Sequence, residues 1–105
     1  MLEVSMANFE DQVIQSSIPV IMEFGAVWCA PCKRLEPELE KLQNQWKDKF
    51  VLAHVNVDQD PDLAMEFSVM SVPTTVLIKD GQEVERFIGF KPIGKMIELF
   101  ENYID

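Results

Sequence analysis

Residues 28–33 read Trp-Cys-Ala-Pro-Cys-Lys and contain both cysteines of the 105-residue chain. Only two residues separate Cys29 from Cys32, and at that spacing the first turn of a helix brings the two sulfurs together. The proline between them suits an early helical position, because its φ is preset and it has no N–H to lose. A strand-like apolar run, residues 19–26, precedes the hexapeptide, and a helix-like stretch, residues 31–48, follows it. The pair therefore lies at a helix N-terminus, where the helix dipole and free N–H groups favour a thiolate.

A thiolate is the form of cysteine that attacks a disulfide, so the pair is interpreted as a redox dithiol. We expect Cys29 to be the exposed nucleophile and Cys32, one turn into the helix, to be the resolving thiol that breaks the mixed disulfide. The alternative is half of a zinc site. Structural zinc takes four ligands, and His54 is the only other soft ligand in the chain, so no metal is expected.

The composition is that of a soluble globular protein, with 48% hydrophobic and 26% charged residues. A length of 105 residues suits one domain with one core, spanning residues 1–105. Nine Lys and Arg against eighteen Asp and Glu give a net charge of −9. Nucleic acid and anionic membrane both require a basic surface, so neither is expected as a partner.

The chain contains no apolar run near the ~20 residues of a membrane span. Its first positive side chain is Lys33, so the N-terminal region lacks the basic segment of a signal peptide. We therefore expect a cytoplasmic location. In a reducing compartment a cysteine pair is catalytic or metal-binding more often than a structural crosslink.

Apolar periodicity and turn signals divide the chain into short elements. Ser5 is a candidate N-cap, and so is Asp60, which Pro61 follows at the first helical position. Asp80-Gly81 is a type I′ turn signal between two strand-like runs. The expected strands are 1–4, 19–26, 50–58, 74–79 and 83–88, and the expected helices are 6–15, 31–48, one short helix from residue 61 and a last one from residue 91.

The helix predicted over residues 31–48 carries one apolar stripe and one charged face. On the charged face Arg34 and Glu38 are expected to form an i,i+4 pair. Pro37 should kink the helix without ending it, because the stripe continues past it. The stripe consists of Leu35, Leu39, Leu42 and Trp46.

The order of the elements predicts an α/β fold. A strand–helix–strand unit in the first half requires a crossover and hence a parallel pair of strands. The late hairpin adds antiparallel strands. The result is a mixed sheet between layers of helices.

The hexapeptide closely resembles the active site of the thioredoxin family. The resemblance extends from about residue 4 to the end of the sequence, with motifs in the family's order and spacing. It implies the thioredoxin fold, a central mixed β-sheet sandwiched between α-helices. The further matching motifs are the strand 20–24, the strand 55–58, the Val-Pro-Thr segment 72–74, the turn 79–81 and Gly89.

The resemblance also implies a substrate groove around Cys29. It identifies Pro73 as a cis proline that packs beside the sulfurs and presents the backbone of Val72 to an extended substrate. Trp28 is expected to form a partly exposed aromatic lip, and Phe90 to narrow the groove. The residues assigned to the groove are Trp28, Ala30, Pro31, Val72, Pro73, Ile88, Gly89 and Phe90.

Glu23 is the one acid in an otherwise apolar run, and burial raises the pKa of a carboxyl group. The family has a buried aspartate here, which accepts a proton from the resolving thiol, so Glu23 is the candidate for that role. The alternative is a glutamate that reaches water or pairs with a base. His54 stands where relatives often have lysine and can share a face of the sheet with Glu23, although a structural histidine is the alternative. Lys33 and His54 are assigned supporting roles.

Two small residues also depart from the family pattern. Ala30 replaces the usual glycine, and Gly25 replaces an aromatic residue that is common in relatives.

The resemblance implies a monomeric reductase of disulfides in partner proteins, recharged by a flavin-containing thioredoxin reductase and needing no bound cofactor. Two alternatives stay open at this point. One is a dedicated thioredoxin-like protein that serves a single partner. The other is a binding or scaffold module of the same fold.

Overall fold

The computed structural model describes residues 1–105 as five strands and four α-helices in one layered body. A π-helical turn, Glu10–Ile14, extends the first helix, and 3₁₀ turns at Lys47–Lys49 and Glu101–Tyr103 follow the second and fourth. The strands are β1 (Leu2–Glu3), β2 (Val20–Gly25), β3 (Val51–Asn56), β4 (Thr74–Lys79) and β5 (Gln82–Ile88). The helices are α1 (Met6–Phe9), α2 (Ala30–Trp46), α3 (Pro61–Glu66) and α4 (Ile93–Phe100).

The strands form a single mixed sheet in the order β1-β3-β2-β4-β5. β1, β3 and β2 run parallel, whereas β4 is antiparallel to both β2 and β5. This arrangement confirms the predicted mixed sheet. β2 lies at its centre, with a paired strand on each side, and every residue of β2 is buried.

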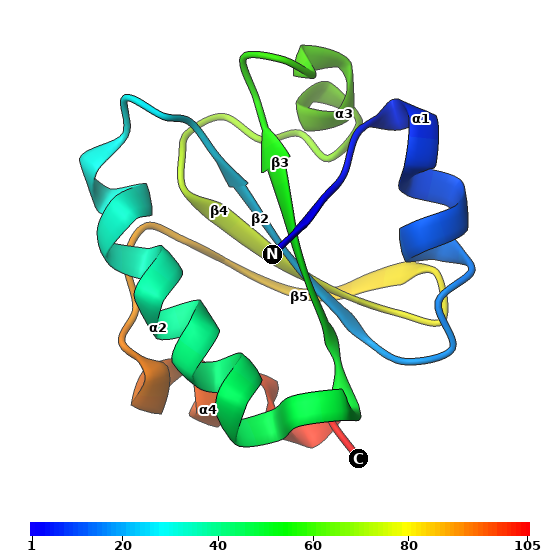
Figure 1. The fold of residues 1–105 in the computed structure, drawn as a ribbon, viewed down its shortest axis with the longest axis vertical. Coiled ribbons are helices and arrows are strands. Elements are labelled where there is room, and N and C mark those ends of the chain that lie inside the picture. The colour runs from blue at the N-terminus through cyan, green and yellow to red at the C-terminus, as the bar shows by residue number, and fades with distance from the viewer.

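Helices cover both faces of the sheet, with α2 and α4 on one side and α1 and α3 on the other (Figure 1). Alternation along β2 sends Met22 and Phe24 toward α1 and α3, and Ile21 toward α2 and α4. Each face has its own apolar core. The α2 and α4 side includes Leu35, Leu39, Leu42, Leu77, Met96 and Phe100, and the α1 and α3 side includes Val13, Val20, Val55, Leu63 and Val76.

Asp60 caps α3 and also forms a hydrogen bond at the start of α1. Its Oδ1 accepts a hydrogen bond from the N–H of Leu63 at 3.1 Å, which confirms it as the N-cap of α3. Its Oδ2 accepts a second bond from the N–H of Met6 at 2.6 Å, at the start of α1. Ser5 caps α1 as predicted, and its hydroxyl accepts from the N–H of Ala7 at 3.3 Å.

The predicted pair between Arg34 and Glu38 is wrong. Glu38 faces the start of α4 and accepts a hydrogen bond from the N–H of Ile93 at 3.0 Å, while Lys41 supplies its ion pair at 2.9 Å. Arg34 lies instead over the ring of Phe90, 5.7 Å from its centroid. Packing of α2 against α4 thus overrides the local i,i+4 pairing.

The other predicted helices and strands are present, and they differ from the prediction by a few residues at their ends. α2 begins at Ala30, continues through Pro37 and stops at Trp46, where Lys47 takes a positive φ of 45°. The hairpin between β4 and β5 turns at Asp80 and Gly81, whose φ values of 52° and 78° are both in the left-handed region that a type I′ turn requires. None of the helices is both long and apolar enough to cross a membrane.

Candidate active site

Cys29 and Cys32 are joined by a disulfide at the N-terminus of α2. Cys29 is the N-cap residue, and its Sγ accepts a hydrogen bond from the N–H of Cys32 at 3.2 Å. A sulfur in this position faces the free N–H groups and the positive end of the helix dipole, both of which stabilise a thiolate once the disulfide is reduced.

The two sulfurs are less accessible than the sequence suggests. Cys29 was expected to be exposed, but only 3% of its surface is open to solvent, against 0% for Cys32. The expectation is wrong because Cys29 packs in a small cluster with Ala26, Val57 and Val72. Of the pair, Cys29 still lies nearer the surface, and Cys32 lies beneath it.

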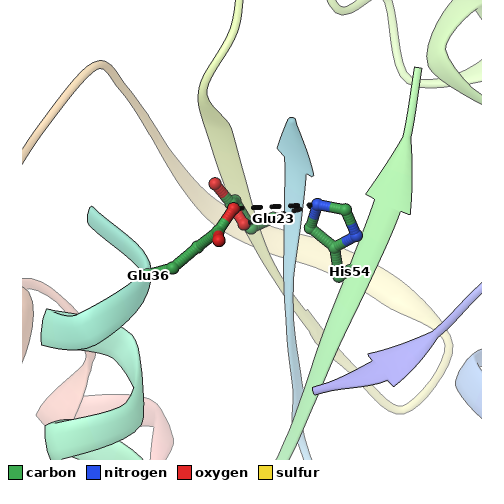
Figure 2. Close-up of side chains that lie close together, drawn as sticks. All are labelled: Glu23, Glu36 and His54. Atoms are coloured by element: carbon green, nitrogen blue, oxygen red, sulfur yellow. Dashed lines mark ion pairs between the residues drawn. The ribbon is translucent and has the colours of Figure 1, made fainter. Parts of the chain in front are cut away.

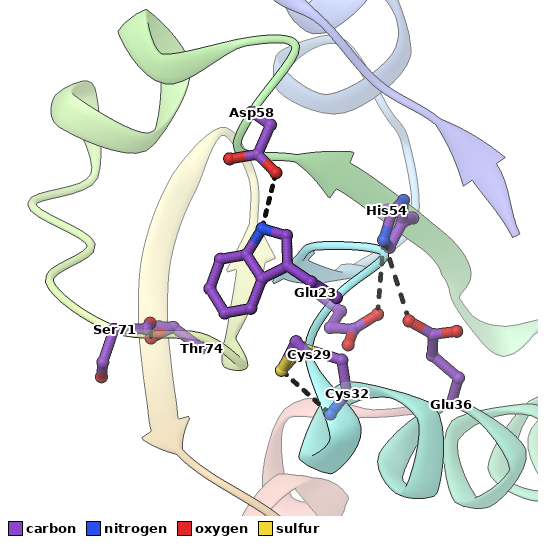
Figure 3. Close-up of a disulfide and its surroundings, with 9 residues drawn as sticks. Glu23, Cys29, Cys32, Glu36, His54, Asp58, Ser71 and Thr74 are labelled. Atoms are coloured by element: carbon purple, nitrogen blue, oxygen red, sulfur yellow. Dashed lines mark hydrogen bonds and ion pairs between the residues drawn. A yellow bond between two sulfur atoms is a disulfide. The ribbon is translucent and has the colours of Figure 1, made fainter.

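Trp28 forms the exposed lip beside the disulfide. Its side chain is 67% exposed, and its indole Nε1–H donates a hydrogen bond to Asp58 Oδ2 at 2.7 Å (Figure 3). Sequence reasoning did not single out Asp58. The signal for it is its position just after β3, at the same end of the sheet as the hexapeptide.

The segment before β4 contains Val72, which packs against the cluster of the two cysteines, and Pro73 follows it. The Val72–Pro73 peptide bond is cis, as the resemblance implied. The carbonyl of Pro73 accepts a hydrogen bond from the N–H of Gly89 at 2.8 Å, and Gly89 takes the left-handed φ of 85° that favours glycine. Thr74 Oγ1 donates to the carbonyl of Ser71 at 2.7 Å, which fixes the turn before the proline.

An apolar pocket of about 200 Å³ adjoins Trp28. Trp28 and Val72 of the predicted groove are part of its wall, together with residues that sequence reasoning did not name. Met70 of this wall is 93% exposed, and Ile88 and Phe90 of the predicted groove are 65% and 43% exposed. The wall consists of Trp28, Val57, Ala64, Val69, Met70, Ser71 and Val72.

Behind the cysteines, a row of polar residues crosses four strands. Glu3 of β1 is the register partner of His54 of β3, His54 that of Glu23 of β2, and Glu23 that of Thr75 of β4. Direct partners in a sheet project from the same face, so all four side chains lie on the α2 side. Figure 3 shows Glu23 between the cysteines and His54.

Glu23 is completely buried, and neither of its carboxylate oxygens has a hydrogen-bond partner in the protein. Burial raises the pKa of Glu23 to about 9, and the negative charge of Glu36 adds to the effect. The alternative that Glu23 reaches water is wrong, because β2 is covered on both faces. Thr75 Oγ1, its neighbour on β4, is likewise buried without a partner.

His54 lies between the buried carboxyl group of Glu23 and the exposed carboxylate of Glu3. Its Nδ1 lies 3.0 Å from both oxygens of Glu3, and its Nε2 lies 3.8 Å from Glu23 Oε1 and 3.8 Å from Glu36 Oε2. The structure thus brings together Glu23 and His54, as predicted. The His54 side chain is 15% exposed and so only partly buried.

Glu36 is the member of this group that sequence reasoning missed. It comes from α2, one helical turn after Cys32, and that i,i+4 spacing is the signal that could have found it. Figure 2 shows the three side chains of Glu23, Glu36 and His54 pointing toward one another from β2, α2 and β3. Their nearest ligand atoms all lie within 4.8 Å of one another.

Gly25 leaves a small space between these groups and the disulfide. A Cβ placed on it would lie 3.2 Å from Glu23 Oε2, 3.3 Å from Cys32 Sγ and 3.3 Å from His54 Nε2. A larger residue here would press on all three atoms. Lys33 is exposed, and it borders a second pocket of about 230 Å³ together with Ala26, Val27, Glu36 and His54.

Fold and site define a small α/β protein with a Cys-x-x-Cys pair at a helix N-terminus and a cis proline directly before β4. The Thioredoxin family model matches residues 1–102, and the chain belongs to the thioredoxin family. It is 45% identical over 84 residues to "Thioredoxin, mitochondrial" of Mus musculus, covering 80% of this chain and 51% of the relative. The chain thus spans about half the length of that relative and of the other mitochondrial thioredoxins that it matches.

Other relatives have different lengths. "Thioredoxin" of Staphylococcus saprophyticus is 37% identical over 103 residues, with 98% of this chain and 97% of that protein covered. The "Bifunctional thioredoxin reductase/thioredoxin" of Mycobacterium leprae is 40% identical over 90 residues, which cover 86% of this chain and 20% of that protein.

Proposed function

We propose that this protein is a thiol–disulfide oxidoreductase that reduces disulfides in partner proteins. The observation that carries the proposal is the position of Cys29, whose sulfur caps α2 and accepts the Cys32 N–H beside an exposed apolar pocket. Membership of the thioredoxin family supports the same activity. Residues 1–105 act as one domain, and no bound cofactor is required.

The reaction proceeds by two exchange steps. In the reduced protein the Cys29 thiolate attacks one sulfur of the partner's disulfide, and the other partner sulfur leaves as a thiolate. The Cys32 sulfur then attacks Cys29, closes the Cys29–Cys32 disulfide and releases the second partner thiol. Two electrons pass to the partner, which is reduced, and the dithiol is oxidised.

Glu23 is proposed to accept the proton that Cys32 must lose in the second step. Both line the space beside Gly25. The pKa of Glu23, raised to about 9 by burial, is close to the ordinary value of about 8.5 for a thiol. Proton transfer between the two groups is therefore nearly balanced, so the deprotonated fraction of Glu23, which grows as pH rises toward 9, can take the Cys32 proton at little free-energy cost.

The partner surface is proposed to comprise the predicted groove and the apolar pocket next to Trp28. Trp28, Ile88 and Phe90 offer exposed apolar side chains, and Val72 offers its backbone beside Pro73. Such a surface suits an extended segment that carries a disulfide. Lys33 and His54 are proposed to have supporting roles.

A thioredoxin reductase is proposed as the electron donor. The relative named as a bifunctional thioredoxin reductase and thioredoxin supports this choice, since it joins the two activities in one chain. The reaction also needs a reducing compartment, so we place the protein, as a monomer, in the cytoplasm. Neither nucleic acid nor membrane is proposed as a partner.

Insulin reduction with dithiothreitol as donor tests the activity. The wild-type protein should accelerate insulin precipitation, and Cys29→Ser should abolish the acceleration. Cys32→Ser should accumulate mixed disulfides through Cys29, identified by mass spectrometry of the trapped peptide. No acceleration by the wild type, or faster alkylation of Cys32 than of Cys29 in the reduced protein, would contradict the proposal.

A further inference from the structure

The group formed by Glu23, Glu36 and His54 has the donors of a metal site. We propose that these three side chains bind a divalent transition-metal ion of the zinc type behind the disulfide. This proposal departs from the expectation of no metal, which considered only the cysteines and His54 as ligands and included neither Glu23 nor Glu36.

The first argument is the state of the Glu23 carboxyl group. It is 0% exposed, its two oxygens have no hydrogen-bond partner, and it points into the gap between β3 and α2 (Figure 2). A buried carboxylate without partners is costly unless a proton or a cation neutralises it. A cation between Glu23 and Glu36 would satisfy both carboxylates at once.

The second argument is the orientation of His54. With Nδ1 3.0 Å from both oxygens of Glu3, the ring donates its Nδ1–H to that carboxylate. In the neutral ring, the lone pair of Nε2 is then directed at Glu23 and Glu36. A histidine ligand oriented by a carboxylate on its other nitrogen is the common arrangement around protein-bound zinc.

The third argument is the spacing of the donor atoms. Nε2 lies 3.8 Å from an oxygen of each glutamate. Zinc–nitrogen and zinc–oxygen bonds of about 2.0–2.2 Å in tetrahedral geometry place ligand atoms about 3.4 Å apart. The two contacts to Nε2 therefore need to shorten by only a few tenths of an ångström, and the three donor atoms, which all lie within 4.8 Å of one another, leave the fourth position to water.

The residues around the proposed site explain how a metal ion would reach it and which ions it would select. His54 and Glu36 border the pocket of about 230 Å³, which gives an ion a route from solvent. Lys33 is the one lysine or arginine on that pocket and Glu36 its one carboxylate, while Glu3 and Glu23 lie next to His54. One imidazole with two carboxylates suits zinc-like ions better than Mg²⁺ or Ca²⁺, which prefer oxygen ligands only.

Zinc chloride titrated into the oxidised protein tests the proposal. The disulfide keeps both cysteines from ligating, and binding is measured without turnover, so the result is independent of the proposed reductase activity. Isothermal titration calorimetry should give one Zn²⁺ per chain. Glu36→Gln should weaken binding at least tenfold, and Glu3→Gln about tenfold through loss of the orienting carboxylate.

The matched control is Glu40→Gln, which removes an exposed carboxylate one turn further along α2 and so changes the net charge equally. It should change the zinc affinity less than twofold. Gly25→Ala, which removes no ligand but crowds Glu23 and His54, should also weaken binding.

His54 is the only histidine, so its ring ¹⁵N signals report directly on the site. Zinc should shift the Nε2 signal in the wild type and leave it in place in Glu36→Gln at the same concentration. The proposal is overturned by unchanged His54 signals, by equal losses in Glu36→Gln and Glu40→Gln, or by no binding at millimolar zinc.

Discussion

Glu23 and His54 are direct partners across the parallel strands β2 and β3, and His54 Nε2 lies 3.8 Å from Glu23 Oε1. The sheet therefore places the fully buried carboxyl group of Glu23 next to the partly exposed imidazole of His54. Because β2 is hydrogen-bonded on both sides, Glu23 cannot turn toward water without disrupting the centre of the sheet.

The stability of the protein should fall as pH rises. The pKa of Glu23 is raised from its ordinary value of 4.5 to about 9 by burial, so the folded protein keeps a proton that the unfolded chain loses over that range. Stability is then lost between roughly pH 5 and pH 9, at no more than about 1.4 kcal/mol per pH unit. Glu23→Gln should flatten the slope and be the more stable protein at pH 8, as measured by urea unfolding.

Glu40→Gln is the control for the stability measurement and should keep the wild-type slope, because Glu40 is exposed on α2. If the free energy of unfolding changes with pH in the same way in the wild type and in Glu23→Gln, then Glu23 does not hold its proton in the folded state.

Glu23→Gln should slow release of the mixed disulfide more than its formation. Formation depends on the Cys29 thiolate, whereas release needs a base for Cys32. Loss of a general base typically lowers a rate on the order of 100-fold. Stopped-flow kinetics with a disulfide peptide separates the two steps, and Glu23→Asp should restore part of the release rate. Equal slowing of both steps would argue for a purely structural role.

His54→Lys should change the pH profile of release, because a lysine holds its charge at pH values where histidine loses it. Release rates should be measured from pH 5 to pH 9 in both proteins. If the release rates of the two proteins depend on pH in the same way, His54 has no part in the proton transfer.

The hydrogen bond from Trp28 to Asp58 should position the indole for partner binding. Asp58→Ala removes the acceptor, and a single hydrogen bond of about 0.5–1.5 kcal/mol corresponds to a loss of a few-fold to about tenfold in kcat/KM with insulin. The fluorescence of Trp28, read in a Trp46→Phe background, should change as well. Glu66→Gln, an exposed acid on α3, is the control and should match the wild type.

Asp60 should contribute more stability than an ordinary N-cap, since its two oxygens serve α3 and α1 separately. Asp60→Ala should cost roughly 1–3 kcal/mol of unfolding free energy. Asp60→Asn keeps one acceptor oxygen and should lose about half as much. Equal losses in the two variants would mean that the bond to Met6 contributes nothing.

Much of the fold could be predicted because local patterns agree with the final packing. The apolar run of β2, the caps at Ser5 and Asp60 and the Asp80-Gly81 turn each specify a local conformation that the sheet keeps. The pair between Arg34 and Glu38 failed because α4 approaches α2 and offers Glu38 the Ile93 N–H. The i,i+4 spacing of residues within a helix gives no information about such contacts between segments that are far apart in the sequence.

The candidate site could be predicted only in part, for a similar reason. The cysteines, Trp28 and Pro73 are adjacent in short motifs, and strand alternation allowed Glu23 and His54 to share a face. The register that aligns Glu3 with His54, and the rotation of α2 that turns Glu36 inward, depend on tertiary packing. The near-complete burial of Cys29 has the same origin, because Val57 and Val72 come from other segments.

The proposed partner surface has an apolar rim, formed by Met70, Ile88 and Phe90, that contributes little to the stability of the fold. Met70, Ile88 and Phe90 are 93%, 65% and 43% exposed, and exposed side chains usually change stability by less than about 0.5 kcal/mol when substituted. The residues of the proposed partner surface can therefore vary independently of those that keep the chain folded. This separation makes the domain a convenient starting point for directed evolution, in which libraries at the rim alter selectivity while the cysteines and the strands stay fixed.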